Sequence, residues 1–229
     1  MQLKIFLVGL LISCTLMAQQ EQEIEKYIDS IYLEDQFYFG LLYNFNMTNN
    51  NNIESSGVPF CVKTGFIKDI PLNKKRNKAL GLGVGYNFDV VRPNIVIQNQ
   101  NQGLVFNVDN SDQSTNYASH EIEFPLEFRW RTSTATNDSF WRIYTGVSFV
   151  KILKSTASFK NSAVNTTTFK DIPAINRNKY TLYTSVGFGT WNLYVKYYLN
   201  RFFDNNIDRE KEENINFNQL KVGVMMYLL

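Results

Sequence analysis

The stretch Glu121–Arg131, EIEFPLEFRWR, constrains the fold of this chain more than any other, because its side chains alternate strictly in character. One parity is wholly apolar: Ile122, Phe124, Leu126, Phe128 and Trp130. The other parity holds charges and a proline: Glu121, Glu123, Pro125, Glu127, Arg129 and Arg131. Successive side chains of a strand point to opposite faces, whereas a helix would scatter these residues around its circumference. The stretch is therefore predicted to be a strand between two very different media.

The same alternation recurs along the chain. It predicts eight strands, at Gln36–Met47, Val58–Ile67, Ala79–Val91, Glu121–Arg131, Phe140–Ile152, Lys179–Gly189, Trp191–Leu199 and Phe217–Leu229. Aromatic residues make up 15% of the sequence and charged residues 19%. The high aromatic content, with thirteen Tyr and eighteen Phe, and the low charge content favour an all-β protein.

The connections between these strands alternate in length. Long polar loops are expected at Thr48–Gly57, Arg92–Ser119, Leu153–Asn178 and Asn200–Asn216, with Ile95–Ile97 and Leu104–Val108 extending the strands that flank the second loop. Short turns are expected at Lys68–Lys78, Thr132–Ser139 and Gly189–Asn192. Long extracellular loops and short periplasmic turns are typical of outer-membrane barrels. The pattern predicts an eight-stranded antiparallel up-and-down transmembrane β-barrel with both termini in the periplasm.

A soluble eight-stranded barrel of the lipocalin kind would place the apolar parity inside instead. Three observations favour lipid on the apolar side. The polar parity is rich in glycine, which suits a narrow interior better than a solvent face. The apolar parity is almost unbroken in all eight strands and would overfill a small interior. Trp130, Trp141 and Trp191 all lie beside the short turns, where an interfacial aromatic girdle belongs.

The first residues predict export. Met1–Lys4 is a short basic start, Ile5–Leu16 is apolar but too short to span a bilayer, and Ala18 ends a plausible cleavage site. Residues 1–18 are therefore expected to be a signal peptide. Residues 19–35 form a periplasmic segment, either a short helix or a loose tail, and residues 36–229 form the barrel. Acylation of Cys14, in a box resembling that of lipoproteins, is the alternative processing of the leader.

With lipid outside, the polar parity must fill the lumen. Eight strands close into a barrel only wide enough for side chains, and charges buried there must pair. The predicted lumen charge cluster is Lys63, Asp89, Glu123, Glu127, Arg129, Arg142, Lys196 and Lys221. Glu127 and Arg129 are expected to meet Arg142 across a short turn and form a plug of salt bridges. A selective pore lined by the same charges is the alternative.

Pro125 conflicts locally with this scheme, because it lacks the N–H that a ladder in a closed sheet uses. The sequence therefore predicts a bulge or kink at this position.

Few residues suggest chemistry. His120 is the only histidine, and Ser119 and Glu121 flank it, so a surface hydrolase site is conceivable. Adjacent strand residues point to opposite faces, however, and the three side chains are not expected to converge. Because Cys14 lies in the predicted signal peptide, one histidine and one cysteine remain for the mature chain. This argues against a His/Cys metal site, and we expect no cofactor. A net charge of +2 without basic runs interleaved with aromatics gives no indication of nucleic acid.

Two resemblances extend this interpretation. The last strand, Lys221–Leu228, looks like the C-terminal signal read by the outer-membrane barrel-assembly machinery, although it ends in leucine where an aromatic is usual. Residues 36–229 resemble the PorT-like, small-porin-like outer-membrane barrels of Bacteroidota. That resemblance lies in Gly65–Asn73 with Leu80–Tyr86, and in Phe124–Thr134 with Phe140–Gly146. It implies a barrel in the outer membrane and, for PorT itself, a link to type IX secretion.

The sequence thus predicts a non-enzymatic outer-membrane barrel. Its expected role is that of a scaffold or accessory, in contact with membrane lipid, with the assembly machinery during biogenesis, and with type IX secretion components as candidate partners. The alternative is a small porin, or a barrel that binds a ligand with its extracellular loops.

Overall fold

The computed structural model describes residues 35–48, 50, 52–100, 103–108, 115–132, 140–160, 166–204 and 215–228. All of them belong to one compact unit, residues 32–229. The predicted signal peptide, and the predicted periplasmic segment except for Asp35, lie outside the described residues. No helix among the described residues is long and apolar enough to cross a membrane.

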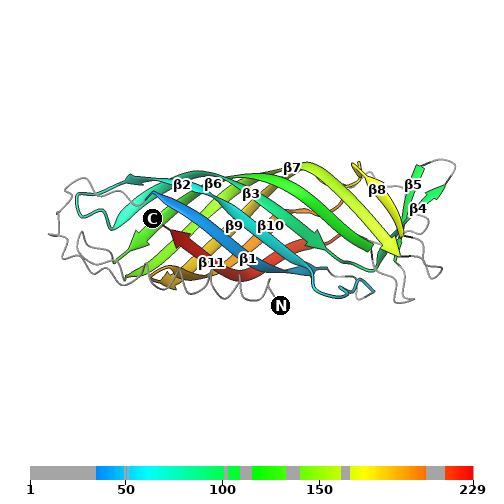
Figure 1. Ribbon diagram of the computed structural model, residues 1–229, viewed down its shortest axis with the longest axis horizontal. Coiled ribbons are helices and arrows are strands. Elements are labelled where there is room, and N and C mark those ends of the chain that lie inside the picture. The colour runs from blue at the N-terminus through cyan, green and yellow to red at the C-terminus, as the bar shows by residue number, and fades with distance from the viewer. Residues whose placement is uncertain are drawn as a thin grey trace, which may run out of the picture. The chain divides into compact units, whose positions relative to one another are not determined.

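Eight antiparallel strands close into a barrel (Figure 1). In spatial order they are β1 (Gln36–Met47), β2 (Phe60–Pro71), β3 (Lys78–Val91), β6 (Thr115–Arg131), β7 (Trp141–Lys160), β9 (Asn178–Phe188), β10 (Trp191–Arg201) and β11 (Asn218–Leu228). β11 pairs with β1, and β6 pairs with β7, which completes the ring. The predicted eight-stranded, up-and-down barrel is confirmed.

Three further strands lie in the long connections. β4 (Ile95–Gln100) and β5 (Gly103–Val108) form a separate two-stranded sheet, and β8 (Thr166–Lys170) pairs with the outer part of β7. The expectation that Ile95–Ile97 and Leu104–Val108 extend the flanking strands is therefore wrong, because these segments pair with each other. We call the end of the barrel with these elements the long-loop end, and the opposite end, with the β2–β3, β6–β7 and β9–β10 connections, the short-turn end.

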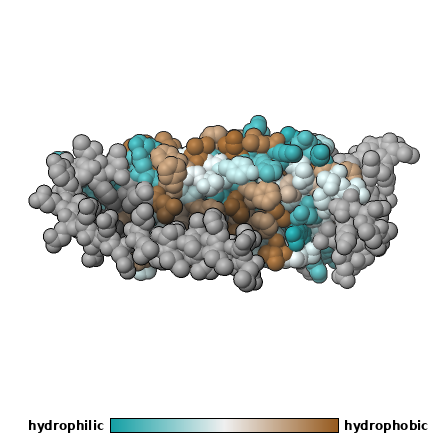
Figure 2. All heavy atoms as spheres, in the orientation of Figure 1, coloured by the Kyte–Doolittle hydropathy of each residue, from teal (hydrophilic) through white to brown (hydrophobic). Residues whose placement is uncertain are grey.

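The two faces of the strands have the predicted character. Large apolar side chains on the outer face are exposed, as in β1, where Phe37, Phe39, Leu41 and Phe45 project outward while Tyr38, Leu42 and Asn44 are buried. Figure 2 shows apolar residues over the middle of the strands and hydrophilic residues toward both ends. Trp141 and Trp191, 55% and 60% exposed, open β7 and β10 at the short-turn end.

Of the bulge or kink predicted at Pro125, the bulge does not occur. Pro125 pairs in register with Ser148 of β7, and on the β3 side the register continues unshifted from Leu126 to Glu123. The pyrrolidine ring lies in the lumen beside Gly83, whose missing side chain makes room: a Cβ there would come within 3.1 Å of the Pro125 Cγ.

A bulge does occur on β7. His120 pairs with Lys154 but Glu121 pairs with Ile152, so Leu153 is an extra residue. A bulge inserts one residue into one strand and reverses which parity faces inward beyond it. Accordingly the inward residues of β7 change from Ile152 to Ser155 and Ala157.

Candidate functional site

The barrel lumen is filled by three layers of ion pairs, which we name by their order from the short-turn end. The lower layer centres on Asp69 of β2, which accepts hydrogen bonds from Arg129 Nη1 at 3.0 Å and Arg131 Nη2 at 2.7 Å. Arg129 also donates its Nε to Glu127 at 2.7 Å and its Nη2 to the Gln36 side chain at 3.0 Å. Each of these side chains is buried. The guanidinium groups are therefore compensated directly by carboxylates.

The middle layer centres on a single carboxylate, Glu123 of β6. It lies 2.8 Å from Lys196 Nζ and 3.2 Å from Lys63 Nζ, so that one anion serves two cations. Asn87 Nδ2 and Ser148 Oγ donate further hydrogen bonds to it at 2.8 and 2.7 Å. Both carboxylate oxygens are thus occupied, as a buried charge requires.

The upper layer holds two carboxylates and two lysines. Lys221 Nζ lies 2.8 Å from Asp89 Oδ2, and Lys179 Nζ lies 3.7 Å from Glu121 Oε1. Gln219 joins the two pairs, because its amide donates to Asp89 at 3.2 Å and its carbonyl accepts from Lys179 at 3.1 Å. The layer is a continuous network.

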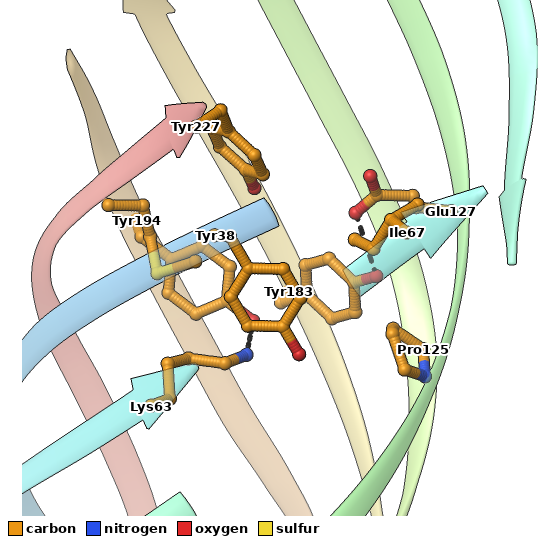
Figure 3. Close-up of a pocket in the computed structure, with 9 residues that line it drawn as sticks. Tyr38, Lys63, Ile67, Pro125, Glu127, Tyr183, Tyr194 and Tyr227 are labelled. Carbon is orange, nitrogen blue, oxygen red and sulfur yellow. Dashed lines mark hydrogen bonds between the residues drawn. The ribbon is translucent and has the colours of Figure 1, made fainter. Parts of the chain in front are cut away.

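Tyrosines fill the space between the lower and middle layers (Figure 3). Tyr183 donates its hydroxyl to Glu127 at 2.9 Å, and Lys63 donates to the Tyr194 hydroxyl at 3.1 Å. A cavity remains there, lined by Tyr38, Lys63, Ile67, Pro125, Glu127, Tyr183, Tyr194, Met225 and Tyr227. Its volume is about 10 Å³, which is about the space that one water molecule needs.

Above the upper layer, all four long loops contribute to one apolar cluster, which we call the cap. Its buried members are Ile53, Val91, Ile95, Ile97, Phe106, Tyr117, Ile152, Ala157, Ile172, Ile175, Phe202, Phe203, Ile215 and Phe217. The cap rests on the charged lumen, since Lys179 Nζ lies 4.9 Å from the centroid of the Phe202 ring. Aromatic rings pack edge-on at its centre: the ring centroids of Phe106 and Tyr117 lie 5.4 and 5.7 Å from that of Phe203. The long-loop end of the lumen is therefore covered by a packed apolar core.

The eight predicted lumen charges are all buried inside the barrel, and seven of them take part in the three layers. Arg142 does not. Its guanidinium carbon lies 4.5 Å from the Phe140 ring centroid and 6.0 Å from that of Tyr227. It forms no ion pair with any described residue, so the expected contact with Glu127 and Arg129 does not form. Arg129 turns instead toward Asp69, a carboxylate that the sequence prediction had placed in a turn.

Four charged residues of the layers were missing from the predicted cluster: Asp69, Glu121, Arg131 and Lys179. Asp69 and Lys179 follow the inward parity of their strands, Asp69 two residues after Ile67 and Lys179 two before Thr181. Extending that parity to the strand ends was the signal that could have found them. The cap had no comparable signal, because its members come from loops and strand ends that are far apart in the sequence and share no common pattern.

His120 lies outside the barrel and its neighbours lie inside. The His120 ring accepts or donates a hydrogen bond at Nδ1 with the Tyr86 hydroxyl and packs 5.2 Å from the Phe88 ring. Ser119 is buried and donates its hydroxyl to Glu121 at 3.1 Å in the lumen. These three side chains therefore do not form a hydrolase triad. Among the described residues, no three His, Cys, Asp or Glu side chains gather as metal ligands.

The comparisons with known proteins agree with the geometry at the level of the family. The model of the outer membrane protein beta-barrel domain matches residues 17–225. Among solved structures, the chain is similar to Ail, the attachment invasion locus protein of Yersinia pestis, at 9% identity and a TM-score of 0.35, covering 86% of this chain and 100% of that one. It is also similar to a major outer membrane protein from Thermus thermophilus, at 10% identity and a TM-score of 0.36, covering 85% and 99%.

No curated protein matches the chain. The two structural likenesses are too weak to carry an inference, and the assignment rests on the family match, which spans most of the sequence. That match agrees with the closed sheet, its exposed apolar outer face and its paired polar interior. The chain belongs to the family of outer membrane protein beta-barrel domains, and its barrel lies in the lipid of the outer membrane.

Proposed function

We propose that this chain is a non-enzymatic, non-conducting barrel that serves as a scaffold or accessory in the outer membrane. Both termini lie in the periplasm, and the long loops with their cap face outward. The observation that carries the proposal is the closure of the lumen at two levels, by three layers of ion pairs and by the apolar cap.

Two barriers in series stand against ion passage. A permeating ion would have to break buried pairs such as Lys221–Asp89, whose separation costs several kcal/mol in a low-dielectric interior. It would then meet the cap, whose side chains are apolar apart from the Tyr117 hydroxyl, which is bonded to the Ile95 carbonyl. Hydrophobic constrictions of this kind exclude water and ions. No residue of the upper layer or of the cap lines the small cavity between the lower and middle layers.

For partners, we propose the barrel-assembly machinery during biogenesis and type IX secretion components afterwards. The first proposal rests on the last strand, Lys221–Leu228, and the second on the PorT-like segments Gly65–Asn73 and Phe124–Thr134. A barrel without a pore or a catalytic site contributes to a secretion apparatus through its surfaces. Its long-loop end and its short-turn end each offer a surface to a partner.

Conductance separates this proposal from a small porin. The full-length protein, refolded into planar bilayers, should give no steady current, while a general porin recorded in the same bilayer gives the expected unitary steps. Steady unitary currents from this chain would refute the closed lumen. The variant Phe203→Ala loosens only the cap. It should also give no steady current, because the three layers of ion pairs are intact.

Partnership is tested by cross-linking in intact outer membranes, followed by purification of the chain. Co-purification of type IX secretion components is the expected result. Recovery of the cross-linked chain with none of these components would exclude that partnership without affecting the conductance result. Hydrolase activity that disappears in His120→Ala would contradict the non-enzymatic part of the proposal.

A further inference from the structure

A cluster of cations occupies the turn between β2 and β3 at the short-turn end. Lys74, Lys75 and Lys78 are exposed, and Arg76 lies among them. None of the three lysines forms an ion pair with a described residue. The described acids at this end have other partners: Asp35 pairs with Lys68, and Asp69 and Glu127 are buried in the lower layer. The turn therefore presents positive charge that the described part of the barrel does not neutralise.

The turn is held in one conformation by its own hydrogen bonds and by the lower layer. The Asn73 side chain donates to Asn77 Oδ1 at 2.6 Å and accepts from the Lys78 amide at 3.2 Å. Arg76 adopts a left-handed φ of 55°, a conformation that persists in a non-glycine residue only where the surroundings fix it. Arg131 supplies that support by donating its Nε to the Arg76 carbonyl at 3.0 Å and its amide to the Asn77 carbonyl at 2.9 Å. The cations are thus displayed from a rigid base.

Apolar and aromatic residues adjoin the cations on the outer face. Ile70 and Leu72 are 41% and 56% exposed, and Trp130 is the cross-strand partner of Lys78. These apolar and cationic residues lie at one level of the barrel, because the Leu72 amide donates to the Lys78 carbonyl and Trp130 pairs with Lys78 across the strands. Tryptophan marks the level of lipid headgroups. An acidic protein partner would be complementary to the cations only. A phospholipid is complementary to both features, because its phosphate matches the cations and its acyl chains match the exposed aliphatic side chains beside them.

We propose that the β2–β3 turn binds an anionic phospholipid of the adjacent leaflet. Lys74, Lys75 and Lys78 contact its phosphate, and Leu72 and Trp130 pack against its acyl chain. A basic residue near an anionic membrane surface strengthens binding by about fivefold. Three such lysines give a preference for anionic over zwitterionic lipid of about a hundredfold at low salt, which screening by about 0.5 M salt should largely remove.

The test uses Trp130 as the reporter. The full-length variant Trp141→Phe/Trp191→Phe is refolded into micelles or vesicles and titrated with brominated phosphatidylglycerol or brominated phosphatidylcholine, which quench tryptophan on contact. Phosphatidylglycerol should quench at least several-fold more effectively per mole. In the same background, the Trp130 fluorescence of the variant Lys74→Gln/Lys75→Gln/Lys78→Gln should be quenched equally by both lipids.

A matched control removes the same charge at the opposite end, with Lys151→Gln/Lys154→Gln/Lys170→Gln, and should keep the preference. All variants are first checked for folding by heat-modifiable gel migration, since every substituted lysine is exposed. Added inorganic phosphate should leave the preference unchanged if a lipid is the ligand, and loss of the preference at millimolar phosphate would point to a free-phosphate site. Equal quenching by both lipids in the starting background, or an unchanged preference in the β2–β3 turn variant, would overturn the proposal.

Discussion

Because Glu123 has two cationic partners, we predict that substituting Glu123 destabilises the barrel far more than substituting one of the two lysines. Glu123 is the only carboxylate of the middle layer and pairs with both Lys63 and Lys196. The substitution Glu123→Gln leaves two buried ammonium groups without a counter-ion. The substitution Lys196→Met leaves the Lys63–Glu123 pair with one charge of each sign.

The expected magnitudes differ accordingly. Removing one partner of a buried ion pair so that the other stays charged costs about 3–5 kcal/mol, and we expect Glu123→Gln to fall in this range. For Lys196→Met we expect at most about 1 kcal/mol, because an apolar side chain of similar volume replaces a charge that shares its carboxylate. The double variant should recover about 1–2 kcal/mol relative to Glu123→Gln alone, since one of the two uncompensated cations is gone.

Reversible urea unfolding in lipid vesicles, followed by tryptophan fluorescence and by gel migration, measures these free energies. Comparable slopes of unfolding against urea among the variants show that the same transition is measured. The reasoning fails if Lys196→Met is as destabilising as Glu123→Gln, or if the two substitutions are additive in the double variant. Glu123→Asp provides a control that keeps the charge and changes only the reach of the carboxylate.

Other parts of the structure give three further predictions. Phe203→Ala, at the centre of the cap, should cost about 3–5 kcal/mol of cap stability, measured as faster proteolysis of the long loops with unchanged gel migration of the barrel. Arg129→Met should destabilise the barrel by about 3–5 kcal/mol, whereas Arg142→Met, which breaks no ion pair among the described residues, should cost far less; equal losses in urea unfolding would contradict the assignment of Arg129 to the lower layer. Gly223→Ala should impair refolding into vesicles, because its new Cβ would lie 2.1 Å from the Leu41 carbonyl oxygen.

The alternation of side chains predicted the barrel strands well where one register runs from end to end. The predicted bounds of β1 agree with the structure, and those of β3 differ by one residue. The prediction ended β7 at Ile152 because the bulge at Leu153 reverses the inward parity, which an alternation pattern cannot follow without knowledge of the partner strand. The predicted start of β6 is late for a different reason: its first residues keep the inward parity, but their outward side chains, Asn116, Ala118 and His120, are not large and apolar.

Charge pairing was less predictable than charge burial. Parity identifies Glu127, Arg129 and Arg142 as inward residues, but it does not say how far around a staggered barrel each long side chain reaches. Arg129 bonds to Asp69 and Gln36, which come from β2 and β1, rather than to the residue across the nearest turn. The cap shows the same limit more strongly, because its members come from four long connections and from the strand ends beside them, and they share no local pattern.

The shared core of the cap ties the four long loops together. Loops on the outside of a membrane barrel are usually free to lengthen or to change composition one at a time. Here Ile53, Ile95, Ile175 and Phe203 come from different loops and pack in one cluster, so a loop that is replaced must supply a matching apolar side chain or loosen the other three. Grafting a foreign epitope into one of these loops would therefore be tolerated only at positions whose side chains point away from the cluster.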